Sequence, residues 1–288
     1  MRVLTVFIII LLIPLHIVLA HSEEASEIPK IEKVEIKQYS LHHIDRLFID
    51  ETKLNQLIDS LENKIYTAPE NAAINEAGKV IDGKQGIMLD KMEFQRSFRE
   101  TFYSNNEEGV LKVPVKEIFP KVDRALLEDI RSNMLGSYST NFNKGNEERS
   151  HNISLATEAI NNYVVFPGET FSFNEVVGER TKEKGYKQAP VIVKGELSED
   201  IGGGICQVSS TLFNAVDLKG IQIIERYAHS KEVPYVPPGK DAAVSWWGPD
   251  FVFKNIYNQP LLIRAAAKDG SLVIHIYSSD TVDYFTGN

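Results

Sequence analysis

The C-terminal stretch 261–277 reads LLIRAAAKDGSLVIHIY, in which two apolar runs flank the polar turn 268–270. Two β-forming runs joined by a short turn that contains Asp-Gly are typical of a β-hairpin. In the second run His275 alternates with Ile274 and Ile276, so its side chain should lie on the opposite face of the strand from theirs. The hairpin indicates that the C-terminal part of the chain is rich in strands.

Outward from this hairpin, residues 151–280 form the expected second domain. Its first element is a helix around 149–163, predicted from apolar residues that recur at three- and four-residue spacing. The segment before it, 132–150, is rich in Ser, Asn and Gly, as is typical of a linker. A helix followed mainly by strands and turns predicts a β-rich α+β domain.

Residues 50–131 predict a smaller α+β domain. Apolar residues recur at helical spacing after Asp50, and Asp90 is placed to cap a second helix. Acidic, Pro-containing sequence precedes this domain and makes 21–49 an expected tether. The pattern also predicts short strands at 72–74, 79–81, 86–89 and 110–115, and a short helix near 124–131.

The composition is that of a globular protein, with 288 residues, 43% hydrophobic and 25% charged. The net charge of −9 argues against binding to the phosphate backbone of nucleic acids. Residues 1–20 contain a long apolar run with polar residues after it, which predicts an export signal. A membrane anchor through residues 3–20 is the alternative. Either segment predicts that the rest of the chain is extracytoplasmic.

Cys206 is the only cysteine, so no intrachain disulfide can form. It follows Gly202, Gly203 and Gly204 and precedes a helical pattern, which places it at a helix start. Unpaired amides and the helix dipole favour a thiolate there, the nucleophilic form of cysteine. Amides of the loop would stabilise an oxyanion, and Gln207 would add a side-chain donor. A small buried hydrophobic residue is the alternative role for the cysteine.

A thiolate nucleophile needs a base or an ion-pair partner. Of the seven histidines, His229 is the best-placed base, because it lies in a polar segment before a Pro-rich turn. Either Asp241 or Glu225 would orient its imidazole, and a purely structural role for His229 is the alternative. No group of His and Cys residues has the spacing of metal ligands, so neither a metal nor another cofactor is expected.

Three aromatic residues, Tyr235, Trp246 and Trp247, lie close to prolines and glycines. Aromatic side chains at such turns line grooves that bind peptides or sugars. The alternative is that the two tryptophans pack as a pair over the core.

Three motifs resemble those of the VanW family. Residues 166–174, FPGETFSFN, resemble its opening motif, and residues 201–212, IGGGICQVSSTL, resemble its central motif. Residues 225–242 then match the next block, and the whole resemblance covers about 135–278. The region before it is similar, more weakly, to the peptidoglycan-binding domain that often precedes a VanW domain.

The resemblance implies an exported bacterial cell-envelope protein from a family named after glycopeptide-resistance clusters. Some members are thought to be L,D-transpeptidases that act through a Cys acyl-enzyme, which would make Cys206 the nucleophile and peptidoglycan stem peptides the partner. We therefore hypothesise a Cys-dependent acyl transferase of peptidoglycan. A non-catalytic module that binds peptidoglycan or a glycopeptide is the alternative, and a structural partner of another envelope enzyme is a third.

Overall fold

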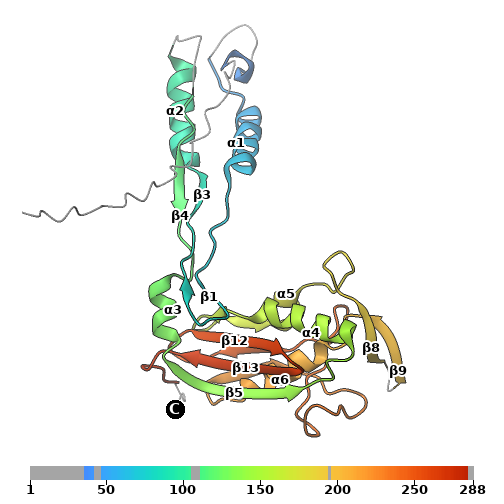
Figure 1. Cartoon of the computed structure of the whole chain (residues 1–288). Coiled ribbons are helices and arrows are strands. Elements are labelled where there is room, and N and C mark those ends of the chain that lie inside the picture. Colours follow the sequence, from blue (N-terminus) through green and yellow to red (C-terminus); the bar gives the residue numbers. More distant parts are fainter. Residues whose placement is uncertain (1–35, 42–46, 105–110, 194–195, 285–288) are drawn as a thin grey trace, which may run out of the picture. The chain divides into compact units, whose positions relative to one another are not determined.

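The computed structural model mixes helices and strands, which confirms the predicted α+β class (Figure 1). The expected export signal or anchor, 1–20, lies outside the described residues, as does most of the expected tether. Among the helices that the structure describes, none combines the length and the hydropathy that a membrane span requires. The described residues are 36–41, 47–104, 111–193 and 196–284.

The chain divides into two compact units. Unit 1 contains the described residues up to Ile65 together with Met88–Lys116. Unit 2 contains Tyr66–Ile87 and the residues from Glu117 onward. Two strands that pair with each other cross this division, β3 (Gly86–Leu89) and β4 (Val115–Ile118).

Unit 1 is built on the two predicted amphipathic helices, α1 (Glu51–Ile65) and α2 (Lys91–Tyr103). The Asp90 carboxylate accepts the amide of Glu93 at 3.1 Å and caps α2, as the sequence predicts. Each helix buries one face. The buried residues are Leu54, Ile58, Leu61 and Ile65 on α1, and Phe94, Phe98 and Phe102 on α2.

The end of the expected tether is folded rather than extended. Residues Ile36–Tyr39 form a short 3-10 helix, η1, in which Ile36 is buried. The ring of Tyr39 packs edge-on against Phe98 of α2, with 5.3 Å between centroids. Apolar contacts, which the acidic composition of 21–49 conceals, therefore attach this segment to unit 1.

Unit 2 contains the remaining helices and strands that the structure describes. In chain order they are β1 (Ala73–Ile74), β2 (Val80–Ile81), α3 (Arg124–Ile130), β5 (Asn133–Asn141), α4 (Glu147–Ile160), β6 (Tyr163–Val165), β7 (Thr170–Ser172), α5 (Phe173–Val177), β8 (Gln188–Val193), β9 (Glu196–Ile201), α6 (Ile205–Ala215), β10 (Ile221–Glu225), β11 (Val252–Asn255), β12 (Leu261–Lys268) and β13 (Ser271–Ser278).

The predicted C-terminal hairpin is confirmed as β12 and β13, the two inner strands of a sheet in the order β5-β13-β12-β6. Asp269 and Gly270 turn the chain with φ angles of 53° and 84°, the positive values that a two-residue hairpin turn needs. His275 is half-buried, whereas Ile274 and Ile276 are buried, so the predicted alternation holds.

The expected linker at 132–150 is wrong, because it contains β5 and the start of α4. β5 pairs antiparallel with β13 from Asn133 to Asn141. It is an edge strand held largely by backbone hydrogen bonds, so its Ser- and Gly-rich composition gives little sign of it. The helix predicted to reach Tyr163 ends at Ile160, because Asn162 adopts a positive φ of 66° and the chain turns into β6.

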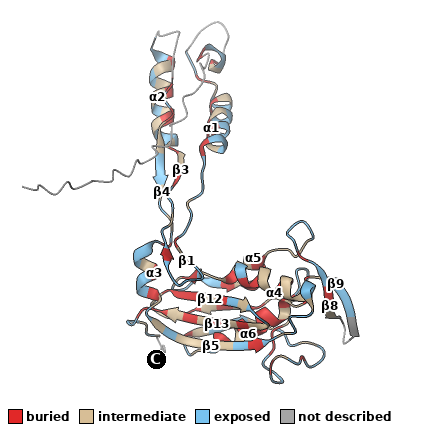
Figure 2. Ribbon diagram, viewed as in Figure 1, coloured by how far each residue is buried: buried red, intermediate tan, exposed pale blue. Residues whose placement is uncertain are grey.

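One face of the sheet β5-β13-β12-β6 is buried and the other is partly covered, because buried and half-buried residues alternate along β13 (Figure 2). Leu261 and Ile263 belong to the core formed with α4 and α6. Leu262, which points the other way, packs with Leu127 of α3 and Ile74 of β1. The expected domain 50–131 therefore has the wrong boundaries, because β1, β2 and α3 cover the second face of this sheet.

Candidate functional site

The glycine loop joins β9 to α6 and places Cys206 in the first turn of the helix. Gly202 and Gly204 have φ angles of 88° and 110°, which residues with a Cβ rarely adopt. A Cβ at Gly203 would lie 2.5 Å from the carbonyl oxygen of Ala189 on β8. The loop therefore needs glycine at all three positions, two for the turn and one for close packing.

Two amides at the start of α6 face no protein acceptor. Within the described part of the chain, no carbonyl or side chain accepts the amide hydrogens of Gly204 and Cys206, and both residues line a pocket. Gly202 also lines the pocket but donates its amide to the Lys187 carbonyl at 3.0 Å. Gly203 packs on β8 instead, so Gly204 and Cys206 provide the donors suited to an oxyanion.

Cys206 is half-buried, and its Sγ donates to the carbonyl oxygen of Val244 at 3.3 Å. The hydroxyls of Ser209 and Ser210 bond to the Cys206 carbonyl at 3.1 and 2.7 Å. Ser209 also donates to the Ala242 carbonyl at 2.6 Å. These serines hold α6 against the neighbouring loop, whereas Cys206 lines the pocket.

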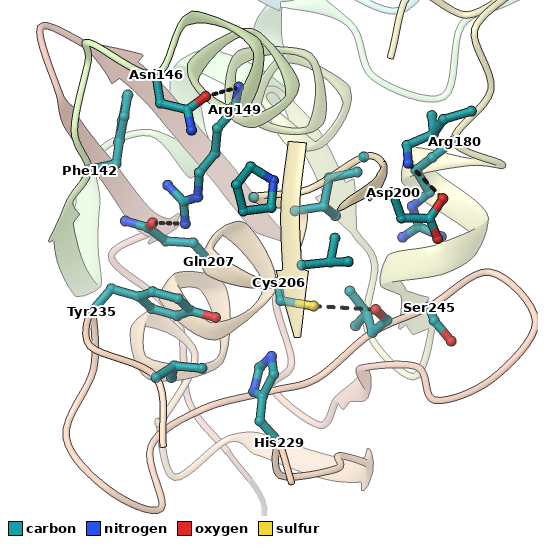
Figure 3. A pocket seen from close by; sticks show the side chains of 18 of the residues that line it. Phe142, Asn146, Arg149, Arg180, Asp200, Cys206, Gln207, His229, Tyr235 and Ser245 are labelled. Atoms are coloured by element: carbon teal, nitrogen blue, oxygen red, sulfur yellow. Dashed lines mark hydrogen bonds between the residues drawn. The ribbon is translucent and has the colours of Figure 1, made fainter. Parts of the chain in front are cut away.

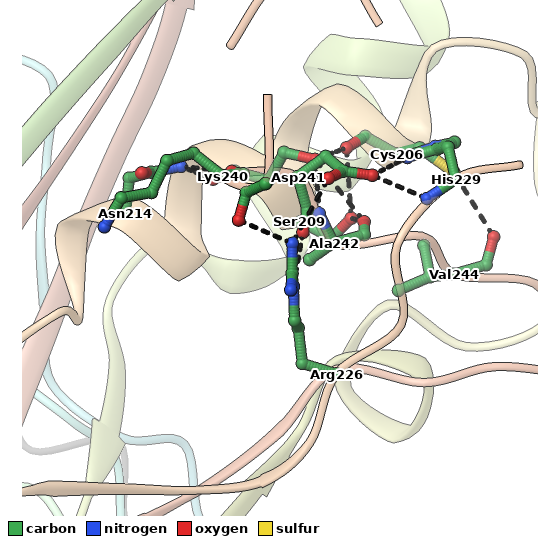
Figure 4. A network of polar contacts seen from close by, with 11 residues as sticks. Cys206, Ser209, Asn214, Arg226, His229, Lys240, Asp241, Ala242 and Val244 are labelled. Atoms are coloured by element: carbon green, nitrogen blue, oxygen red, sulfur yellow. Dashed lines mark hydrogen bonds and ion pairs between the residues drawn. The ribbon is translucent and has the colours of Figure 1, made fainter. Parts of the chain in front are cut away.

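His229 lies near Cys206 and bonds to a carboxylate (Figure 4). Its Nδ1 lies 2.7 Å from Oδ2 of Asp241, and its backbone amide donates to the same oxygen at 2.6 Å. The carboxylate accepts, so Nδ1 carries the proton and the other ring nitrogen is left for Cys206, which lies close enough to influence the pKa of the imidazole. The structure thus brings the three predicted residues into one region: His229 bonds to Asp241 and lines the same pocket as Cys206.

The environment of His229 favours its protonated form, although its side chain is only 8% exposed. Burial alone lowers the pKa of His229, but the hydrogen bonds and charges of Cys206 and Asp241 outweigh it and raise the pKa above 6.5. Burial likewise raises the pKa of Asp241, and the bonds from His229 overcome it and lower the pKa. Each group therefore favours the charged form of the other.

Arg226 anchors the second oxygen of Asp241, a role that the sequence did not suggest. Its Nη2 lies 3.2 Å from Oδ1 of Asp241, and its Nε donates to the Asp241 carbonyl at 2.6 Å. Its guanidinium also lies over the ring of Phe213, 5.0 Å from the centroid. Glu225, the alternative partner for His229, instead accepts the amide of Asp250 at 3.1 Å.

The pocket beside Cys206 has a volume of about 800 Å³. All three predicted aromatic residues line it, and in Figure 3 the hydroxyl of Tyr235 points toward Cys206. Burial raises the pKa of that hydroxyl, so it stays protonated. Trp247 is 89% exposed and Trp246 37% exposed, with their rings 6.1 Å apart. The interpretation of the tryptophans as a pair covering the core is therefore wrong for Trp247.

Gln207 does not have the donor role predicted for it. Its amide nitrogen donates to Oγ1 of Thr140 and to the carbonyl of Asn141, at 2.9 and 3.0 Å, so both of its hydrogens are used. Its oxygen accepts from Nη2 of Arg149 at 2.8 Å. Arg149 and Arg180 both line the pocket, and neither stands out in the sequence, because they come from segments distant from Cys206.

Unit 2 is therefore an α+β domain with a cysteine at a helix start, a histidine–aspartate pair and a pocket lined by aromatic and arginine side chains. A thiol, a base and an orienting carboxylate in this order can support nucleophilic acyl transfer. In the described residues no group of three or more His, Cys, Asp or Glu side chains could hold a metal ion.

The chain belongs to the VanW family. The family model described as VanW like protein matches residues 148–277, which include Cys206, His229 and Asp241. The uncharacterized protein YoaR of Bacillus subtilis (strain 168) is 55% identical over 235 residues, which cover 82% of this chain and 77% of that protein.

A second relative is the Vancomycin B-type resistance protein VanW of Enterococcus faecalis (strain ATCC 700802 / V583). It is 37% identical over 89 residues, 31% of this chain and 32% of that protein. No solved structure matches the chain. The comparisons confirm the family that the sequence motifs indicate, and membership of it associates the protein with the cell envelope.

Proposed function

We propose that this protein is exported to the cell envelope, where Cys206 transfers acyl groups of peptidoglycan stem peptides in an L,D-transpeptidase-like reaction. The observation that carries the proposal is that Cys206 and His229 line one pocket and that His229 bonds to Asp241. Unit 1 would hold the chain on the cell wall. The printed name of the Enterococcus relative, a vancomycin resistance protein, supports a role connected with the wall.

The reaction begins when the Cys206 thiolate attacks the carbonyl carbon of a stem-peptide amide. An S–C bond forms, and the amides of Gly204 and Cys206 stabilise the oxyanion. The imidazolium of His229 gives its proton to the leaving amine as the C–N bond breaks, which leaves a thioester on Cys206. His229 then takes a proton from an acceptor amine, whose attack forms the new amide and releases the thiolate. Water in place of the amine gives hydrolysis.

The test incubates the purified full chain with tetrapeptide muropeptides and follows cross-linked or trimmed products by mass. Cys206→Ala is expected to abolish turnover, and His229→Ala to reduce it roughly 10²–10⁴-fold, because a positioned base contributes about that much. Lys182→Gln changes an exposed residue outside the site and is expected to retain activity. Undiminished turnover in Cys206→Ala would overturn the proposed mechanism.

A non-catalytic binding module is the second candidate, and the exposed Trp247 at the pocket favours it. Exposed tryptophans commonly carry binding energy at recognition surfaces. For such a module, Cys206→Ala would leave the affinity for muropeptides unchanged, Trp247→Ala would weaken it, and no product would form. Isothermal titration with the same muropeptides separates this outcome from catalysis.

A further inference from the structure

Two arginines line the pocket with Cys206 and neither pairs with a carboxylate. Nη2 of Arg149 donates to the amide oxygen of Gln207 at 2.8 Å, and Nη2 of Arg180 donates to that of Asn174 at 2.7 Å. Both acceptors are neutral. Figure 3 shows the two arginines on opposite sides of Cys206.

Among the other arginines that the structure describes, only Arg264 shares this pairing with neutral groups, since it donates to the Ile74 carbonyl at 2.7 Å and to Oδ1 of Asn162 at 2.8 Å. The chain has 40 acidic residues against 31 basic ones, so carboxylates are in excess. Five other arginines pair with one of them. They are Arg96 with Glu93, Arg99 with Glu51, Arg124 with Asp82, Arg131 with Glu128, and Arg226 with Asp241.

The carboxylates at the pocket do not neutralise these two arginines. Glu179 and Asp200 line it, but Oδ1 of Asp200 accepts the amide of Ile201 at 2.7 Å. Within the described residues, no acidic side chain lies within ion-pair distance of Arg149 or Arg180. Asp250 acts on Arg180 through its charge but forms no ion pair with it. Each guanidinium therefore brings to the pocket a positive charge that no described carboxylate pairs with, which is costly in a half-buried setting.

Both arginines are held in place. Gln207 is 1% exposed, and its amide nitrogen is fixed by Thr140 and Asn141, so its oxygen must face Arg149. Nε and Nη1 of Arg149 have no acceptor among the described residues. Arg180 lies over the ring of Phe173 at 5.9 Å, and its Nη1 is buried without a described partner. Both guanidinium groups are therefore fixed in position and retain N–H donors that have no described acceptor.

We propose that Arg149 and Arg180 form a carboxylate-binding subsite beside Cys206, and that the peptide bound in this pocket carries a free carboxylate. The identity of the ligand as a peptide rests on the proposed function, whereas the subsite itself does not. The planar guanidinium donates two parallel hydrogen bonds to a carboxylate, which suits arginine to this task better than lysine. An anionic ligand would supply a negative charge to pair with the two guanidinium groups.

The positive charges also act on the thiol, so the test must separate support of the thiolate from recognition of a ligand. It compares alkylation of Cys206 in the purified full chain by iodoacetate, which is anionic, and iodoacetamide, which is neutral and of similar size. The sulfur displaces iodide in both reactions. A longer pair, iodoacetyl-glycine and iodoacetyl-glycinamide, places the carboxylate farther from the reacting carbon. A change in thiolate population alters both rates of a pair equally, so their ratio reports recognition of the carboxylate.

In at least one pair, the anionic-to-neutral rate ratio should exceed that of free N-acetylcysteine roughly tenfold, the effect of a hydrogen bond between charged groups. Arg149→Gln and Arg180→Gln should each lower the ratio, and Arg149→Lys should retain part of it. Lys182→Gln removes an exposed charge near Arg180 and should leave the ratio unchanged. If Arg149→Gln does not fold, the reduced ratio expected for Arg149→Lys still tests the role of Arg149.

A wild-type ratio no higher than that of the free thiol in both pairs would overturn the subsite, as would a ratio that survives both glutamine substitutions. The measurement requires no turnover. A high ratio in a protein that does not process muropeptides supports the subsite and rejects the proposed function. If the protein processes muropeptides but its anionic-to-neutral rate ratio is no higher than that of the free thiol, the subsite is rejected and the proposed function stands.

Discussion

Among single residues, Asp241 is the one that organises the site. One carboxylate oxygen accepts two bonds from His229, and the other contacts Arg226. The sequence could indicate Asp241 only as one of two acids near a histidine. It could not indicate Arg226, because the arginine acts through a carboxylate 15 positions away and leaves no periodic signal.

The protonation of His229 should depend on Asp241. We expect nuclear magnetic resonance titration to give His229 a pKa above 6.5, and Asp241→Asn to lower that pKa, because the substitution removes the adjacent negative charge. Because the pKa is raised in the folded state, protonation of His229 stabilises the fold below the pKa of the unfolded chain. This stabilisation is lost as the pH rises through the folded pKa.

Urea unfolding should therefore show His229→Gln to be more destabilising at about pH 5.5 than at about pH 9. An unchanged His229 pKa in Asp241→Asn would contradict this account.

Arg226→Met should destabilise the protein by about 2 kcal/mol, since it leaves the Asp241 carboxylate with one unpaired, largely buried oxygen. The same variant should slow alkylation of Cys206 by iodoacetamide at neutral pH, because a loosened Asp241 no longer fixes His229. Lys240→Gln is the matched control. It breaks the exposed pair with Asp217 and should change stability by no more than about 0.5 kcal/mol. Equal effects of the two substitutions on alkylation would contradict a positioning role for Arg226.

At the scale of elements, the glycine loop fixes the start of α6 against β8. Gly203→Ala should destabilise the fold by roughly 1–3 kcal/mol, the usual cost of overpacking, because its Cβ would meet the Ala189 backbone at 2.5 Å. Gly168→Ala, at a φ of 77° with nothing within 4 Å of its Cβ, tests backbone strain without a clash and should cost about 1 kcal/mol. Thermal unfolding measures both. The packing argument fails if Gly203→Ala is the milder change.

The elements that the sequence predicts well are those whose own residues determine them. Asp90 caps α2, and Asp269-Gly270 turns the C-terminal hairpin, because each signal acts within a few positions. The sequence does not predict β5, because this edge strand is held by backbone hydrogen bonds to β13 and has no distinctive side-chain pattern. The same reasoning explains Gln207, whose amide nitrogen bonds to Thr140 and Asn141 of β5 and so has no hydrogen left for a ligand.

For the molecule as a whole, each compact unit is built from segments that are separated in the sequence. Residues 66–87 lie in the first half of the sequence but belong to unit 2. There Ile74 packs with Leu262 on one face of the sheet. No local pattern indicates this, because the contact joins residues far apart in the sequence. The site residues all lie in unit 2, so the fold that positions Cys206 needs 66–87.

This organisation predicts which truncation preserves the site. A chain that lacks 1–65, with 88–116 replaced by a short Gly-Ser linker, should unfold cooperatively, because unit 2 has its own core. Its Cys206 should react with iodoacetamide within about twofold of the full-chain rate, since the residues described above at the site all belong to unit 2.

Further removal of 66–87 exposes Leu262, Val164 and Leu127, which are buried in the intact protein. Each buried aliphatic side chain contributes about 1.5–3 kcal/mol, so this shorter chain should be destabilised by several kcal/mol and lose its cooperative transition. Equal stability of the two truncated chains would show that β1 and β2 do not belong to the folding unit of the site. A large loss of Cys206 reactivity in the first truncation would show that unit 1 contributes to that site.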